Sequence, residues 1–277
     1  MGFASGYRRQ RLSVNAPVTL GIIGTGLIGA SIGLRGRDLG WRVVGFDAQA
    51  AAADAALQRG AIDEIVTHDA LYEHADTVVI AVPPRATVEE LEALRARSVR
   101  ATLVLDVASI KTPICDAARG VASFVATHPL AGSDRSGPSA ARATMFFGKP
   151  WIYVPAADKA LEMRARDFIA AMGARAIPSD PAAHDDILAL TSHLPQLMAT
   201  LFSKSLRQQS IADVESFCGP VAAELLRLGN SNAELWREIF AYNAENLARH
   251  AREMASKLNA AAQALVSKAE HEEHDSH

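Results

Sequence analysis

The first residues whose types and spacing indicate a chemical function are three closely spaced glycines and a later aspartate. Gly24, Gly26 and Gly29 follow an apolar run, and Asp47 lies 23 residues after the first of them. Between a strand and a helix, such glycines permit a tight turn, let the backbone approach a pyrophosphate and let the helix pack closely. A carboxylate about 20 residues later can accept hydrogen bonds from ribose hydroxyls. The predicted dinucleotide contacts are Gly24, Thr25, Gly26, Leu27, Ile28, Gly29 and Asp47.

The residues that follow Asp47 bear on which dinucleotide binds. They are Ala48, Gln49 and Ala50, none of which is cationic. A 2′-phosphate at this place would meet a carboxylate and find no positive partner. The sequence therefore predicts NAD as the cofactor and disfavours NADP.

Two further polar residues are candidates for the chemistry itself. His128 directly follows an apolar stretch at 124–127, and imidazole is the side chain that titrates nearest to neutral pH. Oxidation of an alcohol needs a group that takes the proton from oxygen as hydride leaves carbon, which predicts His128 as the acceptor. Ser109 can hydrogen-bond the same oxygen or the nicotinamide amide. Its competing interpretation is a helix N-cap ahead of Pro113.

These residues need a parallel sheet that brings them to one edge, since ligands of open α/β sheets bind beyond the carboxyl ends of the strands. Continuous apolar runs predict buried strands, and helical stretches alternate with them up to residue 179. Val82 and Pro83 end one such strand and are predicted to lie over the nicotinamide side. The expected strands are 18–23, 41–46, 62–66, 77–82, 102–107, 124–127, 151–154 and 175–177.

After residue 180 the pattern changes to helices, with apolar residues at i, i+3 and i+4 spacing. The fold class is therefore predicted as α/β, a doubly wound Rossmann-type parallel sheet domain followed by a smaller all-helical domain. So small a helical domain has trouble burying its own core, which favours a homodimer formed through these helices. The expected division is a flexible extension at 1–17, a dinucleotide-binding domain at 18–180, a helical substrate and dimerisation domain at 181–269 with a long helix at 248–268, and a disordered tail at 270–277.

Composition narrows the class of protein. The net charge of −3 gives no reason to expect a nucleic-acid partner or an anionic membrane surface. No apolar run is long enough to span a bilayer, and the two cysteines, Cys115 and Cys218, do not make a disulfide framework. A cytoplasmic enzyme is expected. The His-rich end could bind a metal adventitiously, but we interpret it as a solvated tail and predict no metal site.

Several motifs together resemble the prephenate/arogenate (cyclohexadienyl) dehydrogenase family over about residues 18–250. They are the glycine motif, the segment 106–111 with sequence DVASIK, the segment 128–137 with sequence HPLAGSDRSG, the segment 192–195 with sequence SHLP, and Arg227 nine residues ahead of Trp236. The most specific of them is the segment that begins His-Pro. The glycine motif is shared with many other oxidoreductases.

The resemblance implies NAD-dependent oxidative decarboxylation of prephenate to 4-hydroxyphenylpyruvate, or of arogenate to tyrosine. It implies that His128 takes the hydrogen bond or proton of the ring hydroxyl, with Ser109 contacting that hydroxyl and the nicotinamide. Arg227 would bind the ring carboxylate, because a guanidinium matches a carboxylate in two parallel hydrogen bonds. A helix-surface pair with Glu224 is the competing interpretation of this arginine. The remaining residues implied on the substrate side are Ser133, Asp134 and His193.

The chain departs from the family pattern on the substrate side. Gln196 stands where many members have a second histidine, and the segments 219–226 and 229–233 lack residues usual in the family. Prephenate, arogenate and a 4-amino analogue all remain open as substrates. Two other interpretations also stay open. One is a β-hydroxyacid or imine-reducing dehydrogenase, for which His184, Asp185, Asp186 and Lys204 are the residues on offer; the other is a non-catalytic NAD-sensing protein.

Overall fold

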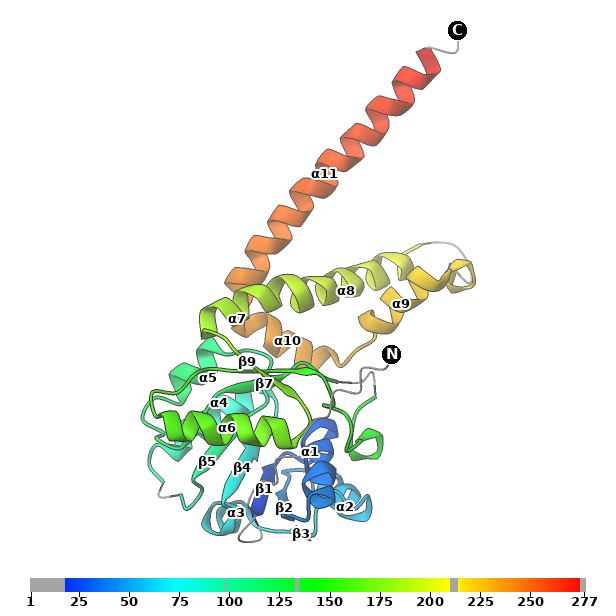
Figure 1. Ribbon diagram of the computed structural model, residues 1–277. Helices are drawn as coiled ribbons and strands as arrows, with labels where there is room; N and C mark the ends of the chain where they lie inside the picture. Colours follow the sequence, from blue (N-terminus) through cyan, green and yellow to red (C-terminus); the bar gives the residue numbers. More distant parts are fainter. Residues whose placement is uncertain (1–17, 98, 133–134, 210–213, 275–277) are drawn as a thin grey trace, which may run out of the picture.

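The main layer of the molecule is a six-stranded parallel sheet with strand order β3-β2-β1-β4-β5-β6 (Figure 1). The computed structural model describes residues 18–97, 99–132, 135–209 and 214–274, without the side chains of 215 and 268–274. The order reverses between β1 and β4, the position at which open α/β sheets bind nucleotides. The predicted Rossmann-type domain is therefore confirmed.

The elements of this part alternate as the apolar runs predict. The strands of the main sheet are β1 (Thr19–Ile23), β2 (Arg42–Phe46), β3 (Glu64–Ile65), β4 (Thr77–Ile80), β5 (Leu103–Asp106) and β6 (Phe124–Val125). The helices between and after them are α1 (Leu27–Asp38), α2 (Ala50–Gln58), α3 (His68–His74), α4 (Pro84–Leu94), α5 (Thr112–Ala117) and α6 (Lys159–Ala171). The short helix α3 was not predicted.

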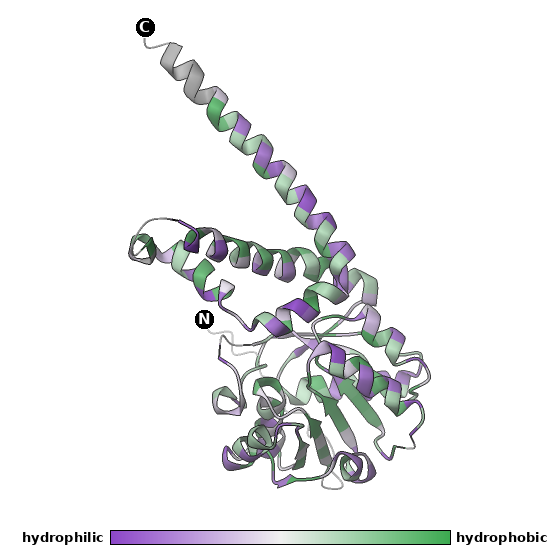
Figure 2. Cartoon of the chain, turned by 180° about the vertical axis from the view of Figure 1, so that it is seen from behind, coloured by the Kyte–Doolittle hydropathy of each residue, from purple (hydrophilic) through white to green (hydrophobic). Residues whose placement is uncertain are grey.

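Both faces of the sheet are covered by helices, which is why its central strands are mainly apolar (Figure 2). Along β1, Leu20 and Ile22 face one core and Ile23 faces the other. The first core also contains side chains of α1, α2 and α6; the second contains side chains of α3, α4 and α5. The sheet is thus fixed from both sides, and its carboxyl edge is held rigidly.

The strands predicted at 151–154 and 175–177 are present but do not join the main sheet. A second sheet, with order β7-β8-β9, contains β7 (Thr127–Pro129), β8 (Pro150–Tyr153) and β9 (Arg175–Pro178). The chain leaves the main sheet at Ala126, because the Thr127 amide donates to Asp106 Oδ1 at 2.8 Å and does not continue the β6 ladder. Strand β7 then pairs antiparallel with β8, so that His128 lies opposite Ile152. The predicted strand at 124–127 is therefore two strands, and His128 lies within the second and not beyond its end.

The C-terminal part is helical, as predicted. It contains α7 (Pro181–Leu188), a π-helical turn at Ala189–His193, α8 (Leu194–Arg207), a 3-10 turn at Val214–Phe217, α9 (Pro220–Gly229), α10 (Ala233–Tyr242) and α11 (Ala244–His274). The predicted long helix at 248–268 is longer at both ends. Figure 1 shows α8 and α9 side by side to one side of the sheet, and α11 extending far from the rest of the chain.

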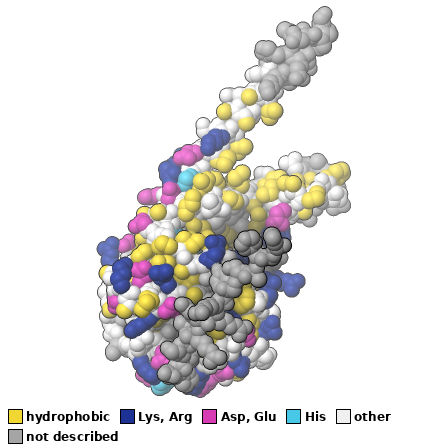
Figure 3. Space-filling model, viewed as in Figure 1, with side chains coloured by type: hydrophobic (Ala, Val, Ile, Leu, Met, Phe, Trp, Pro, Cys, Tyr) yellow, Lys and Arg dark blue, Asp and Glu magenta, His cyan; other side chains and the backbone are white. Residues whose placement is uncertain are grey.

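This helical part leaves large apolar side chains at the surface. Within the described chain none of the residues of α9 is buried, and Val221 on this helix is 79% exposed. Figure 3 shows hydrophobic side chains gathered along α8 and α9 and at the base of α11. Among the helices that the structure describes, none is both long enough and apolar enough to cross a membrane.

Candidate active site

The glycine turn takes the form that the sequence predicts. Gly24 has a φ of +88°, and its amide donates to Phe46 O at 2.8 Å, which ties the turn to the end of β2. A Cβ at Gly29 would lie 2.0 Å from Gly24 O, so this glycine is required for α1 to pack on the turn. Gly26 is the N-cap of α1, and apart from its chain neighbours and the backbone of the helix, no heavy atom of the described residues lies within 4 Å of a Cβ built on it. The helix N-terminus is therefore accessible to the pyrophosphate of a dinucleotide, whose charge it favours.

The acidic residue after β2 is tied to the same turn. Asp47 Oδ2 accepts hydrogen bonds from the amide of Thr25 at 2.8 Å and from its hydroxyl at 3.1 Å. The amide of Gln49 donates to Asp47 Oδ1 at 2.9 Å. The carboxylate thus stands at the place where an adenosine ribose is bound in folds of this kind.

The end of β4 completes this part of the edge. A Cβ at Gly24 would lie 2.8 Å from the Val82 side chain, so the two predicted cofactor contacts lie against one another. Pro83 is the N-cap of α4 and is exposed. The turn after β1, the carboxylate after β2 and the loop after β4 therefore surround one edge, and these residues fit a dinucleotide.

His128 lies in a buried chain of hydrogen bonds. Its Nδ1 is 2.9 Å from His184 Nε2, and His184 Nδ1 is 2.8 Å from Asp185 Oδ1. Asp185 also accepts hydrogen bonds from the amides of Lys111 and Thr112, each at 2.7 Å. The side chains of His128, His184 and Asp185 are all buried, with exposed fractions of 7%, 0% and 3% respectively. Helix α7 thus delivers two side chains that fix the imidazole on β7.

The hydrogen-bond partners of His128 and His184 determine which ring nitrogens carry the protons. A carboxylate only accepts, so His184 donates to Asp185 from Nδ1. In its neutral form His184 then has a lone pair at Nε2, which accepts the proton on His128 Nδ1. His128 Nε2 is therefore the nitrogen that can take up a proton, which is the form a general base needs.

Burial and charge keep His128 neutral. Burial is the main cause that lowers its pKa well below the ordinary value, and His184, Lys111 and His193 lower it further. Burial raises the pKa of Asp185, but hydrogen bonds from His184, Thr112 and Lys111 outweigh it, and the net pKa lies below the usual range. A neutral imidazole is consequently oriented by an ionised carboxylate, the arrangement found in catalytic triads.

Ser109 lies in the loop between β5 and α5, which is anchored at both ends. On one side the amide of Ala108 donates to Asp106 Oδ2 at 2.9 Å; on the other, Lys111 forms a fully buried ion pair with the same carboxylate. Lys111, and not Ser109, is the N-cap of α5. The competing interpretation of Ser109 as an N-cap is therefore wrong, while its catalytic role stays a prediction.

His193 is also buried, at the end of the π-helical turn. Its Nδ1 is 3.2 Å from Asn243 Nδ2, and its ring meets that of Trp236 edge to face with centroids 6.1 Å apart. Among the described residues, its Nε2 has no hydrogen-bond partner. Burial is the main cause that lowers the pKa of His193 to about 4. The side-chain amide of Asn243 also donates to Asp185 O at 2.6 Å, so the junction between α10 and α11 joins the same buried network.

The other predicted substrate residues are less closely gathered. Arg227 lies on α9 with its side chain 45% exposed, and it pairs with Glu224 at 2.6 Å, the contact that the competing interpretation requires. Gln196 is buried and donates to Leu228 O at 2.7 Å, which ties this helix to the start of α8 near His193. The substrate role of Arg227 stays a prediction. Ser133 and Asp134 lie outside the described residues.

Sequence reasoning alone did not find the network around His128. It weighed His184 and Asp185 only for other dehydrogenase chemistries, and it gave Asn243 no role. The signal in the sequence was weak, because two adjacent polar residues such as His184 and Asp185, at the start of an amphipathic helix, are also typical of a solvated surface. Nothing in the local sequence shows that they meet a residue 56 positions earlier.

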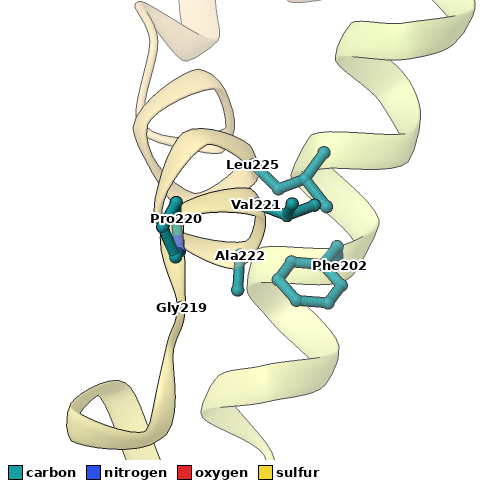
Figure 4. Close-up of a pocket in the computed structure, with 6 residues that line it drawn as sticks. All are labelled: Phe202, Gly219, Pro220, Val221, Ala222 and Leu225. Atoms are coloured by element: carbon teal, nitrogen blue, oxygen red, sulfur yellow. The ribbon is translucent and has the colours of Figure 1, made fainter.

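An apolar groove of about 350 Å³ lies at the far end of the helical part (Figure 4). Phe202 on α8 faces Val221, Ala222 and Leu225 on α9. The groove lies at the start of α9, whereas Arg227 and the contact between Leu228 and Gln196 lie near the end of this helix. Among the described residues that line the groove, none has a polar side chain that could orient a small substrate.

Comparison with known families agrees with this geometry. A family model described as the nucleotide-binding domain of prephenate dehydrogenase matches residues 32–178. A second, described as the prephenate dehydrogenase dimerization domain, matches residues 180–275. The first match begins within α1, three residues after Gly29, so the evidence for the glycine turn is the geometry itself.

Two curated relatives are similar over most of this chain. The probable prephenate dehydrogenase NovF of Streptomyces niveus is 34% identical over 252 residues, which are 86% of this chain and 67% of that protein. The prephenate dehydrogenase of Bacillus subtilis is 30% identical over 241 residues, which are 83% of this chain and 65% of that protein. The chain thus spans about two thirds of the length of these relatives.

Solved structures are similar over nearly the whole chain. Prephenate dehydrogenase from A. aeolicus, in complex with hydroxyphenyl propionate and NAD⁺, has a TM-score of 0.84 at 27% identity and covers 92% of this chain and 93% of its own. Synechocystis arogenate dehydrogenase has a TM-score of 0.74 at 25% identity and covers 91% and 93%. Together with the two domain matches, these similarities show that the chain belongs to the prephenate dehydrogenase family.

Proposed function

We propose that this protein catalyses the NAD-dependent oxidative decarboxylation of a cyclohexadienyl substrate in aromatic amino-acid biosynthesis. The substrate is prephenate, which gives 4-hydroxyphenylpyruvate, or arogenate, which gives tyrosine. The observation that carries the proposal is the buried chain from Asp185 through His184 to His128 at the nucleotide-binding edge. Relatives named prephenate, arogenate and cyclohexadienyl dehydrogenase support it.

The position of His128 suits this reaction. The amide of Thr127, its neighbour, is bonded to the last residue of β5, and only β4 separates β5 from the glycine-bearing β1. Strands lie about 4.8 Å apart, so the two sites are separated by roughly 10 Å along the carboxyl edge. A nicotinamide that extends from a pyrophosphate on α1 can therefore reach the imidazole.

The protein supplies a proton acceptor for the reaction and a carboxylate that stabilises the resulting charge. When bound, NAD supplies the hydride acceptor, at C4 of its nicotinamide. His128 Nε2 takes the proton of the ring hydroxyl, and the carboxylate of Asp185 stabilises the resulting positive charge through His184. Carbon dioxide leaves from the opposite ring carbon and the ring becomes aromatic. Because aromatisation drives the reaction, the protein mainly orients and polarises the substrate.

Four further residues are proposed on the substrate side. We assign Arg227 to the ring carboxylate, Ser133 and Asp134 to the mouth of the site, and His193 to a buried contact with the substrate. A bound carboxylate would compete with Glu224 for the Arg227 guanidinium, and exchange of one carboxylate for another needs little rearrangement of the helix surface. His193 supports this assignment through its unpaired, buried Nε2, which is suited to accept or donate one hydrogen bond.

The deciding experiment offers purified protein prephenate and arogenate in parallel, each with NAD⁺ and with NADP⁺. We expect NADH formation together with a new aromatic absorbance for at least one of the two substrates. His128→Asn is expected to lower kcat by roughly 10²- to 10⁴-fold while NAD⁺ affinity stays within a few-fold. Dinucleotide binding without turnover of either substrate would favour the NAD-sensing alternative, and NADH without an aromatic product would favour a hydroxyacid dehydrogenase.

The homodimer predicted through the C-terminal helices is part of the proposal, and the dimerization-domain match supports it. Along α11, apolar residues recur with the alternating spacing of three and four that is typical of a coiled-coil seam. The seam is buried against the body at Leu247 but continues outward to Leu258 and Leu265, which are 56% and 72% exposed. Its members are Leu247, Ala251, Met254, Leu258, Ala261 and Leu265. We propose that a second copy covers this seam and the groove between α8 and α9.

The cytoplasmic location stays a prediction.

A further inference from the structure

Thr25, the residue between the first two glycines of the turn, is in an unusual position for such a motif. It is fully buried, and both its amide and its hydroxyl donate to the same oxygen, Asp47 Oδ2, at 2.8 and 3.1 Å. Its methyl group packs in the opposite direction, since a Cβ at Gly45 would lie 3.1 Å from Thr25 Cγ2. The packing of the methyl therefore fixes the rotamer that aims the hydroxyl at the carboxylate.

These contacts determine which part of Asp47 can meet a ligand. A carboxylate has about four lone-pair positions, two on each oxygen. Oδ2 uses both of its positions on Thr25, and Oδ1 uses one on the amide of Gln49. With respect to the described residues, the remaining position is on Oδ1, in an orientation that the turn fixes before any ligand binds.

We propose that Thr25 is a positioning residue that sets the selectivity of this protein for NAD over NADP. It holds the Asp47 charge where the 2′ position of the adenosine ribose lies, so that Oδ1 accepts the hydroxyl of NAD and repels the phosphate of NADP. The inference rests on the proposed function only in taking a nicotinamide dinucleotide as the ligand.

The residues that directly follow Asp47 supply no cation to a 2′-phosphate. No lysine or arginine occurs at 48–58, the residues that follow Asp47 and form α2. The next basic residue, Arg59, donates to Ala141 O at 3.4 Å. If the carboxylate were free to rotate, it could turn away from a phosphate into solvent, because Asp47 is only half-buried. The hydroxyl of Thr25 restricts that rotation together with the amides of Thr25 and Gln49, so part of the penalty against NADP depends on the hydroxyl.

Thr25→Val tests the proposal, because valine keeps the branched shape and the amide donor but has no hydroxyl. We expect the ratio of Kd for NADP⁺ to Kd for NAD⁺, measured by calorimetry, to fall roughly tenfold, equivalent to about 1.4 kcal/mol. Thr25→Ser keeps the hydroxyl and is expected to stay within about twofold of the wild-type ratio. Thermal unfolding of each variant shows that the fold is intact.

A second background shows whether the effect acts through the carboxylate. In Asp47→Ala, adding Thr25→Val should change the ratio by less than about twofold, because the positioned group is gone. An unchanged ratio in a folded Thr25→Val protein would overturn the proposal. So would an equal loss of affinity for both dinucleotides, or an effect of the same size in the Asp47→Ala background. Because binding is measured, failure to turn over prephenate or arogenate would leave this test standing.

Discussion

Replacing His184 with phenylalanine separates the orientation of His128 from the packing around it. Phenylalanine keeps an aromatic ring against His128, where the two imidazoles now meet edge to face with centroids 5.2 Å apart. It removes both nitrogens, and with them the bonds to His128 Nδ1 and Asp185 Oδ1. Nothing then fixes which nitrogen of His128 carries the proton, so part of the population has no acceptor at Nε2.

The size of the effect follows from one buried hydrogen bond. Leaving a buried donor without its partner costs about 1–3 kcal/mol, and only the bond to His128 bears directly on the reacting proton. In rate terms this is roughly a ten- to hundredfold fall in kcat. Burial is the main cause that lowers the pKa of His128 and His184 is the next, so the substitution also raises this pKa. The acidic limb of the kcat/KM profile should therefore move to higher pH.

The assay follows NADH formation with the better of prephenate and arogenate across a range of pH. His74→Phe, on the exposed surface of α3, is a matched control that should change neither kcat nor the profile. In the His128→Asn background, His184→Phe should cause little further loss, because the two residues act as a unit. A folded His184→Phe protein with wild-type kcat and an unmoved acidic limb would refute the assignment of the proton acceptor.

Three other outcomes are expected. Arg227→Ala should raise the KM for the cyclohexadienyl substrate roughly tenfold or more and barely change the KM for NAD⁺. Glu224→Ala, which removes the carboxylate paired with Arg227, should raise neither KM. Equal increases of both KM values after Arg227→Ala would indicate structural damage. The free energy of unfolding should fall as pH drops below 6.5, since buried His128 and His193 stay neutral while the unfolded chain takes up protons. For His193, whose pKa is lowered from 6.5 to about 4, the loss reaches about 3 kcal/mol by pH 4, and denaturant titrations at several pH values would show whether it occurs. Leu258→Glu on α11 should convert the dimer to monomer by light scattering at a protein concentration where Asn259→Asp stays dimeric; two dimeric variants would argue against the seam.

Much of the nucleotide-binding half could be predicted because its signals are local. The glycine turn needs Gly24 at a positive φ and Gly29 at a close contact, and both requirements can be read from spacing alone. Strands covered on both faces are continuous apolar runs, so β1, β4 and β5 are visible in the sequence. Asp47 was found for the same reason, as it lies at a fixed distance from the turn.

The second sheet and the buried network could not be predicted, because both depend on contacts between distant residues. The apolar pattern continues across Ala126, and the strand is diverted where Thr127 bonds to Asp106, 21 residues earlier. His184 meets His128 across 56 residues. The π-helical turn adds a further difficulty, since it breaks the regular spacing just before His193 and turns that side chain inward.

The spacing within the segment 106–111 can now be explained physically. Asp106 accepts the amides of Thr127 and Ala108 and pairs with Lys111, whose own amide donates to Asp185. Continued through His184, His128 and the adjacent Thr127, these bonds form a closed ring that joins β5, β7 and α7. A buried ion pair is weak evidence for stability, but losing one partner costs about 3–5 kcal/mol. The ring therefore couples the position of the Ser109 loop to the orientation of the imidazole.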